Sequence, residues 1–189
     1  MMEADTSPSV ILIAGPGGAG KTTMAKRIGT KPGWVALSED EFWNRLPREP
    51  HTFRTDAEKA IVQGMVVDAA IERLERGERI VIEFIIYEDP PQPIQFYATI
   101  LAEAGYQVAV RVLRPSVDAL LHRQANRGNA HDTEVSVEIR RGFAEQQVRC
   151  LNSQAIEAKW VIDSSELSID DVYETHFAPL VEAGVSSRI

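Results

Sequence analysis

The sequence predicts a doubly wound α/β domain with a five-stranded parallel sheet, and three observations support this prediction. Short apolar runs alternate with longer segments of helical spacing, as in a parallel sheet covered by helices on both faces. The length of 189 residues suits one domain with a full core. The apolar fraction of 44% and the charged fraction of 25% are typical of globular proteins. We therefore predict a single domain over residues 1–189, with residues 1–8 disordered.

The expected elements follow one another along the chain as strand, helix, strand. The apolar runs that predict strands cover residues 9–14, 33–37, 79–83, 107–113 and 159–163. Apolar residues at helical spacing predict helices over 21–28, 57–75, 94–104, 116–125, 134–151 and 168–181. A short helix after Ser38 is also expected, because Ser38 and Glu41 have the spacing of a capping box. Ser168 and Asp171 have the spacing of a second N-terminal cap. In such a sheet, ligands bind beyond the carboxyl ends of the strands.

A glycine-rich segment after the first predicted strand carries the clearest functional pattern. Its sequence, Gly-Pro-Gly-Gly-Ala-Gly-Lys-Thr, matches G-x-x-x-x-G-K-[ST] at every fixed position. The glycines let backbone N–H groups converge on phosphate oxygens, and the next helix directs its positive end there. The alternative is a glycine-rich turn without a ligand, but the strand before it and the helix after it are the required context. We expect nucleotide contacts from Gly15, Pro16, Gly17, Gly18, Ala19, Gly20, Lys21, Thr22 and Thr23.

Two side chains of this segment have distinct expected roles. Lys21 is expected to bridge the β- and γ-phosphates, and the Thr22 hydroxyl is expected to ligate Mg²⁺. The sequence N-K-x-D, which recognises guanine in regulatory GTPases, does not occur in the chain. The sequence therefore favours ATP with Mg²⁺ as the bound nucleotide.

Three consecutive acids follow the second predicted strand. A kinase that phosphorylates a hydroxyl group needs a carboxylate near the γ-phosphate to orient the hydroxyl and accept its proton. We predict that Asp40 is this catalytic base, that Glu41 belongs to the capping box and that Glu39 faces solvent. Acids are also favoured in the first turn of any helix, which is the alternative explanation for all three.

Three segments together resemble a known family: Gly15–Thr22, Trp34–Pro47 and Gly77–Glu83. They are similar to the chloramphenicol phosphotransferases, which belong to the small P-loop kinases with shikimate, gluconate and polynucleotide kinases and the zeta toxins. The resemblance covers most of the chain in order and spacing, and residues 34–47 are its most specific part. It implies a P-loop NTPase fold with three α/β/α layers and a helical lid, and it places Asp40 at the family's catalytic carboxylate. The family often has two acids at the end of the third strand, whereas here Glu83 is followed by Phe84.

The end of the third strand and nearby aromatic residues are candidates for the metal and acceptor sites. Glu83 ends an apolar strand, and we expect it to hold Mg²⁺ through a water or to bind the acceptor. The alternative is a strand-end acid in solvent. Trp43, Phe84 and Tyr87 are expected to line the acceptor side, where they can stack on an apolar substrate, with core packing as the alternative.

A small basic region lies in the second half of the chain. Between residues 111 and 149 there are seven arginines and five acids, whereas the whole chain has a net charge of −8. In related kinases a lid between two helices carries such arginines, so the resemblance implies a lid over residues 126–134. Arg123 and Arg127 are one helical turn apart, and we predict that they contact phosphate and assist catalysis. Solvated helix faces with Arg–Glu pairs are the alternative.

Composition narrows the function further. The negative net charge counts against general binding of nucleic acid and against docking on anionic membranes. The lone cysteine, Cys150, fits a reducing cytoplasm. The sequence thus predicts a cytoplasmic ATP-dependent kinase that transfers the γ-phosphate to a hydroxyl group of a small molecule, with antibiotics among the candidates. The alternatives are a polynucleotide or nucleotide kinase and an ATP-binding toxin-like or regulatory switch protein. The oligomeric state is left open.

Overall fold

The computed structural model describes residues 7–47, 54–126 and 136–183. Most of the predicted lid, residues 127–134, and the predicted disorder of residues 1–6 lie outside these ranges. None of the helices within the described ranges is both long and apolar enough to cross a membrane.

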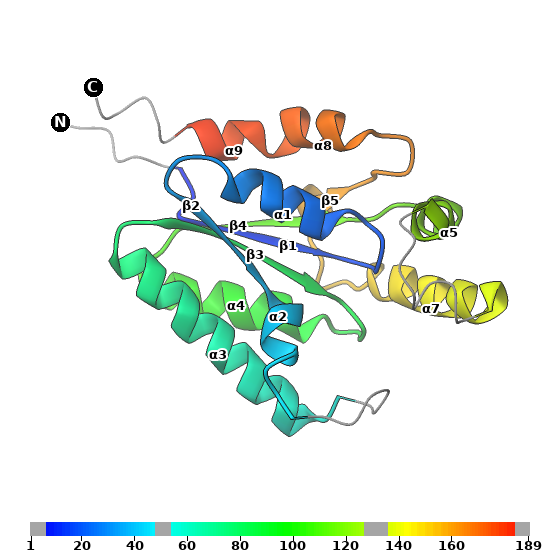
Figure 1. Cartoon of the computed structure of the whole chain (residues 1–189), viewed down its shortest axis with the longest axis horizontal. Coiled ribbons are helices and arrows are strands. Elements are labelled where there is room, and N and C mark those ends of the chain that lie inside the picture. The colour runs from blue at the N-terminus through cyan, green and yellow to red at the C-terminus, as the bar shows by residue number, and fades with distance from the viewer. Residues whose placement is uncertain (1–6, 48–53, 127–135, 184–189) are drawn as a thin grey trace.

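The centre of the fold is one parallel sheet of five strands (Figure 1). Its strand order is β2-β3-β1-β4-β5. All six residues of β1 are buried, as expected for the central strand of a sheet covered on both faces. The five-stranded parallel sheet predicted from the sequence is confirmed. The strands are β1 Val10–Gly15, β2 Trp34–Ser38, β3 Arg79–Ile85, β4 Val108–Leu113 and β5 Val161–Ile162.

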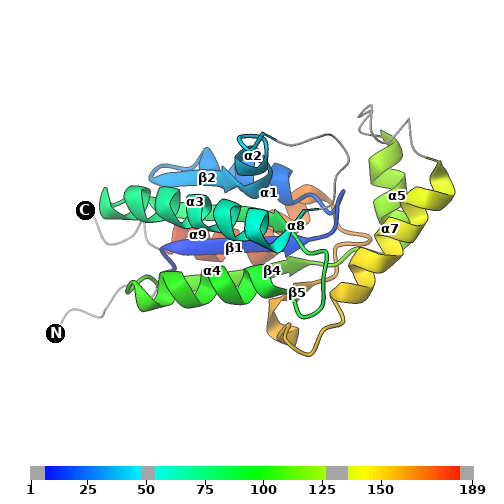
Figure 2. The same ribbon diagram turned by 90° about the horizontal axis from the view of Figure 1, so that it is seen from below.

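Helices cover both faces of the sheet and complete three layers (Figure 1). One face carries α1 (Lys21–Gly29), α8 (Ile169–His176) and α9 (Ala178–Glu182). The other carries α2 (Glu39–Trp43), α3 (Asp56–Glu75) and α4 (Gln92–Glu103). Two further helices, α5 (Val117–Asn126) and α7 (Val137–Cys150), lie side by side at one end of the sheet (Figure 2). A short 3-10 turn, η1 (Ala158–Trp160), precedes β5.

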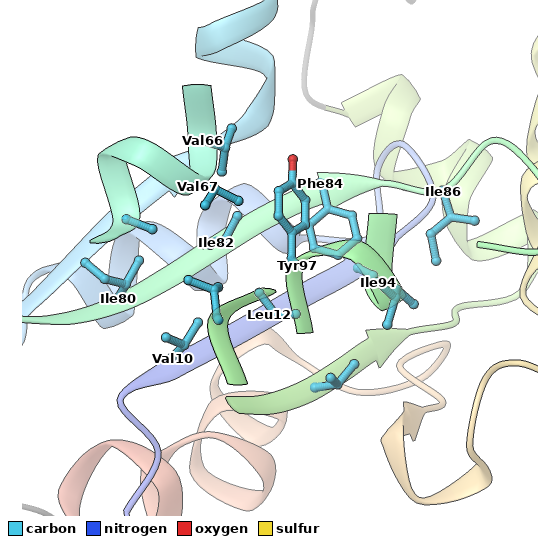
Figure 3. Close-up of a cluster of buried hydrophobic side chains, with 14 of the residues drawn as sticks. Val10, Leu12, Val66, Val67, Ile80, Ile82, Phe84, Ile86, Ile94 and Tyr97 are labelled. Atoms are coloured by element: carbon cyan, nitrogen blue, oxygen red, sulfur yellow. The ribbon is translucent and has the colours of Figure 1, made fainter. Parts of the chain in front are cut away.

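The two faces of the sheet pack into separate apolar clusters. On β3, Ile80, Ile82 and Phe84 belong to the cluster beneath α3 and α4 (Figure 3). Val81 lies in the other cluster, with the helices α1 and α8. Neighbouring residues on a strand point to opposite faces, so the position of each residue along β3 decides which layer it reaches.

Several local predictions differ from the structure. The helix predicted over 168–181 is broken at Phe177, because Pro179 has no N–H to continue the helical hydrogen bonds. The fifth strand is only two residues long, since the residues before it form η1. The capping box of Ser168 and Asp171 is confirmed. The capping box predicted at Ser38 is wrong, since no side chain caps α2 there and the Ser38 hydroxyl bonds to Glu83 instead.

Candidate active site

The glycine-rich loop links β1 to α1 and turns sharply at both ends. At Gly15 the backbone has φ +152°, and a Cβ atom there would lie 2.5 Å from the carbonyl oxygen of Leu113. Gly20 has φ +95° immediately before the first residue of α1. Only glycine adopts these conformations without strain, and at Gly15 only glycine fits beside β4. The loop therefore folds back over the end of the sheet.

A cavity of about 480 Å³ opens above this loop. Loop and helix residues 17–23 line one side of it, and Asp40 and Glu83 line another. Gly15 and Pro16 precede the lining stretch. The strand order explains the meeting of these residues, because β3 lies directly between β1 and β2. Three neighbouring strands thus bring the lysine, the threonine and two acids to one edge of the sheet.

Lys21 and Thr22 occupy the first turn of α1, where side chains can reach the cavity. Lys21 is only 5% exposed, and its Nζ donates to the carbonyl oxygen of Pro16 at 2.9 Å. This hydrogen bond holds the start of the loop close to the Lys21 ammonium group. A buried ammonium ion beside converging backbone N–H groups fits a polyphosphate anion.

Glu83 is a buried acid inside β3, at 4% exposure. In the register of the sheet it lies opposite Ser38 of β2. Its Oε1 accepts a hydrogen bond from the Thr22 hydroxyl at 3.1 Å and another from the Ser38 hydroxyl. The alternative of a solvated acid at the strand end does not fit this burial. A carboxylate and a threonine hydroxyl in contact are an oxygen donor set that fits Mg²⁺.

Glu39 does not face solvent, contrary to the sequence prediction. It is 7% exposed, and its carboxylate accepts hydrogen bonds from Trp43 Nε1 and from the Tyr97 hydroxyl, each at 2.9 Å. Trp43 lies one helical turn further along α2 and Tyr97 lies on α4, so these bonds tie α2 to the helical layer below. Burial raises the pKa of the Glu39 carboxyl above its ordinary value of 4.5, while both hydrogen bonds oppose this change.

Replacing Glu39 with glutamine is expected to flatten the pH dependence of stability. Because the folded protein holds the Glu39 proton to higher pH than the unfolded chain, the native state binds more protons above pH 4.5. The unfolding free energy of the wild type should therefore fall as pH rises through that window. Urea unfolding at a series of pH values should show a smaller fall for Glu39→Gln. The exposed neighbour Glu41→Gln is the control, and an equal fall in all three proteins would contradict the assignment.

Asp40 lies at the cavity and has a partner that the sequence analysis missed. Its Oδ1 accepts a hydrogen bond from the Arg54 guanidinium at 3.3 Å. The Arg54 guanidinium lies 4.3 Å from the centre of the Trp43 ring and 5.1 Å from that of Tyr87. This ion pair orients the Asp40 carboxylate. It contributes only about 0.2–1 kcal/mol of stability, because the Asp40 side chain is 55% exposed. Arg54 belongs to no motif that marks it in the sequence.

The three aromatic residues predicted at the acceptor side have different positions. Phe84 is 2% exposed and packs on Tyr97 in the core, with 5.2 Å between ring centroids (Figure 3). Its prediction as a substrate contact is wrong because it alternates with Glu83 and points to the opposite face of the sheet. Trp43 is 5% exposed and also packs in that core, although its ring meets Arg54. Tyr87 is exposed, and its ring also lies near the Arg54 guanidinium.

Arg123 is the one predicted phosphate contact of α5 within the described residues. It lines the cavity, and its guanidinium donates to the carbonyl oxygens of Ser164 and Leu167. These carbonyls belong to the loop before α8, so Arg123 links α5 to the segment that leads into α8. Arg127 lies outside the described residues. Arg141 forms an ion pair with Asp118, which matches the alternative of solvated helix faces.

Part of the cavity lining is apolar. Leu167, Ile169 and Val172 line the cavity together with Ser164 and Ser168. The cavity thus combines polar groups from α1 with an apolar part beside α8. Such a division suits a ligand with a charged polyphosphate and a flat apolar ring.

The strand order, the loop after β1 and the lysine–threonine pair that opens α1 define a P-loop kinase-like protein. A comparison with families of related sequences finds one match. Residues 10–149 match the AAA_33 family, described as an AAA domain, and the chain belongs to this family. No curated protein matches the sequence significantly.

Solved structures with the same fold include several kinases. The chain is similar to the tunicamycin resistance protein of Deinococcus radiodurans, with a TM-score of 0.65 and 21% identity over 95% of this chain and 96% of that chain. The chain is also similar to shikimate kinase from Acinetobacter baumannii in complex with shikimate. The TM-score is 0.63 and the identity 16% over 96% of this chain and 97% of that chain.

A further similarity is to a chain of the Pnkp1/Rnl/Hen1 RNA repair complex. The TM-score is 0.57 and the identity 22% over 77% of this chain, which spans only 44% of that longer chain. At identities this low, all three similarities establish the fold. Together with the family, they support a nucleotide-dependent kinase in general.

Proposed function

We propose that the protein is an ATP-dependent kinase that transfers the γ-phosphate to a hydroxyl group of a small molecule. One observation carries the proposal: Lys21, Thr22, Asp40 and Glu83 line a single cavity at the carboxyl ends of three neighbouring strands. A cation, a hydroxyl–carboxylate pair and a second carboxylate are the groups that phosphoryl transfer to an alcohol requires.

In this proposal the loop and Lys21 bind the triphosphate in the polar part of the cavity. Backbone N–H groups of Gly18, Gly20, Lys21 and Thr22 surround the phosphates, and the Lys21 ammonium group neutralises charge on their oxygens. Thr22 and Glu83 hold Mg²⁺, directly or through water. Bound Mg²⁺ supplies neutralisation of the charge on the β- and γ-phosphate oxygens. The apolar part lined by Leu167, Ile169 and Val172 takes the adenine ring.

Replacing Glu83 with glutamine is expected to raise the Mg²⁺ concentration needed for half-maximal activity by roughly tenfold. The amide keeps the shape of the side chain and one oxygen that can accept from Thr22 and Ser38, but it loses the charge that favours the metal. Activity titrated with Mg²⁺ measures this effect. Glu103→Gln, exposed on α4, is the control, and an unchanged Mg²⁺ requirement in Glu83→Gln would remove Glu83 from the metal site.

The transfer step uses Asp40 as the proton acceptor. The acceptor oxygen forms a bond to the γ-phosphorus as its proton passes to the Asp40 carboxylate. The bond between the γ-phosphorus and the bridging oxygen breaks, and ADP leaves with the electron pair. Arg54 is bound to Oδ1 of Asp40, so Oδ2 is the oxygen that this pairing leaves for the acceptor hydroxyl.

An antibiotic is the acceptor that two independent similarities favour. The segments Gly15–Thr22, Trp34–Pro47 and Gly77–Glu83 resemble chloramphenicol phosphotransferases, and the tunicamycin resistance protein shares the fold over nearly its whole length. An expressing host is expected to tolerate a higher concentration of at least one hydroxyl-bearing antibiotic, and Asp40→Asn is expected to abolish that gain. Unchanged tolerance across such antibiotics would count against this acceptor class while leaving the kinase reaction in place.

The reaction itself is tested by transfer of labelled γ-phosphate from ATP–Mg²⁺ across a panel of hydroxyl compounds. The panel contains antibiotics, sugars, nucleosides and oligonucleotides, and Asp40→Asn is assayed beside the wild type. Label on one small compound, lost in the variant, is the expected result. Label on an oligonucleotide would support a polynucleotide kinase, which the net charge of −8 disfavours. Label only in free phosphate, unchanged by Asp40→Asn, would overturn the kinase and support an ATP-driven switch.

A further inference from the structure

One residue of the phosphate-binding loop, Gly17, forms hydrogen bonds with two glutamine side chains. The Gly17 N–H donates to Oε1 of Gln147 at 2.9 Å. The Gly17 carbonyl oxygen accepts a hydrogen bond from Nε2 of Gln124, also at 2.9 Å. Both glutamines are half-buried and lie more than 100 positions away from Gly17 in the sequence. Both polar groups of this loop residue are thus satisfied by distant side chains.

The two glutamines come from the two helices that stand at the end of the sheet. Gln124 lies on α5 and Gln147 lies on α7 (Figure 2). Each helix also sends apolar side chains into the core, Leu120 from α5 and Ala144 and Cys150 from α7. Helices α5 and α7 are therefore held to the domain by apolar packing and to the loop by the hydrogen bonds to Gly17.

The glycines at positions 17 and 18 leave room for the two glutamine side chains. The phosphate-binding motif requires glycine at positions 15 and 20 but accepts other residues at positions 17 and 18. A Cβ atom on Gly18 would lie 3.1 Å from Cγ of Gln124, closer than ordinary van der Waals contact. A Cβ atom on Gly17 would lie 3.7 Å from Oε1 of Gln147. The absence of a side chain at Gly18 lets Gln124 lie flat on the loop.

A neutral side-chain amide also suits a position beside the phosphate-binding loop. A glutamine oxygen accepts the Gly17 N–H without adding negative charge beside a polyphosphate, whereas a carboxylate would repel it. Gln124 is next to Arg123, whose guanidinium bonds to the loop before α8. Through these neighbours, α5 contacts the phosphate-binding loop and the loop before α8 at once.

We propose that Gln124 and Gln147 are positioning residues that fix α5 and α7 to Gly17, hold the loop in its nucleotide-binding shape and place Arg123 at the cavity. The proposal rests on the nucleotide-binding part of the proposed function and not on the acceptor. Each bond is a single neutral hydrogen bond, so the loss of one is expected to weaken nucleotide binding by roughly fivefold to tenfold.

The test compares Gln147→Leu and Gln124→Leu with the wild type. Binding of a non-hydrolysable ATP analogue with Mg²⁺ is measured by calorimetry, and hydrogen exchange of the Gly17 amide is measured by NMR without nucleotide. Gln147→Leu is expected to speed exchange at Gly17 and weaken binding, whereas Gln124→Leu weakens binding by loosening α5. The control is Gln146→Leu, since Gln146 is exposed on the same helix. Melting temperatures of all variants show whether each remains folded.

A second variant separates the hydrogen bond from the charge. Gln147→Glu keeps an acceptor for the Gly17 N–H, so slow exchange should be retained while the added charge weakens analogue binding. Wild-type binding in both leucine variants, or rapid exchange at Gly17 in the wild type, would overturn the proposal. Nucleotide binding in the wild type without phosphate transfer to any acceptor would instead contradict the kinase alone.

Discussion

Lys21→Ala is expected to lower kcat/KM for ATP by roughly a thousandfold. The ammonium group is buried in the polar part of the cavity, where charge-assisted contacts to phosphate are worth about 1.5–3 kcal/mol each. Loss of two such contacts in the transition state gives a factor of this size. Steady-state kinetics with varied ATP measure the effect, together with direct binding of the non-hydrolysable analogue.

Lys26→Ala provides the matched comparison, because Lys26 is exposed on the same helix α1. Its kinetics should equal those of the wild type. The melting temperature of Lys21→Ala is needed as well, since removal of a buried charge alters stability in its own right. Equal kcat/KM in Lys21→Ala and Lys26→Ala would mean that the loop does not hold the reacting nucleotide.

Asp40→Asn is expected to lower kcat by about 10²- to 10⁴-fold, the usual contribution of a general base. Asparagine has the same shape and can still contact the acceptor, but it does not take up the proton. Affinity for the ATP analogue should stay close to that of the wild type, because Asp40 lines the cavity from α2 and does not belong to the loop that binds the phosphates. Single-turnover transfer to the identified acceptor measures the chemical step.

Glu41→Gln is the control for Asp40→Asn, since Glu41 is an exposed acid in the same first turn of α2. It should transfer phosphate at the wild-type rate. Near-wild-type transfer by Asp40→Asn would show that another group accepts the proton, and the buried Glu39 would not be that group because Trp43 and Tyr97 occupy its carboxylate.

The sequence was sufficient for the sheet, the loop and the side chains of α1, because each follows from a local pattern. The motif over Gly15–Thr22 has fixed spacing, and apolar runs mark buried strands. Glu83 was also within reach, as the single acid in an apolar run. Its neighbour Phe84 was misplaced although strand alternation, a property visible in the sequence, puts the two on opposite faces. That error came from treating the strand end as one site.

Other features depend on contacts that a single sequence does not display. Glu39 reads as a surface acid, and only the packing of α2 on α4 brings the Tyr97 hydroxyl to it. Trp43 at the i+4 position was a visible signal that a donor could meet this acid. Arg54 and the two glutamines reach the site from segments that carry no motif. Their roles follow from tertiary proximity, which propensity and spacing do not encode.

The order of the strands also sets the spacing between the phosphate-binding loop and the segment that carries Asp40. The loop follows β1 and Asp40 follows β2, with β3 between them. Adjacent strands are about 4.8 Å apart, so the ends of β1 and β2 are about 10 Å from each other. Backbone hydrogen bonds of the sheet set this spacing, which therefore does not depend on the side chains of the site. A larger acceptor has to extend outward past the ends of the strands, so engineering of acceptor size should target the segments after β2 and β3.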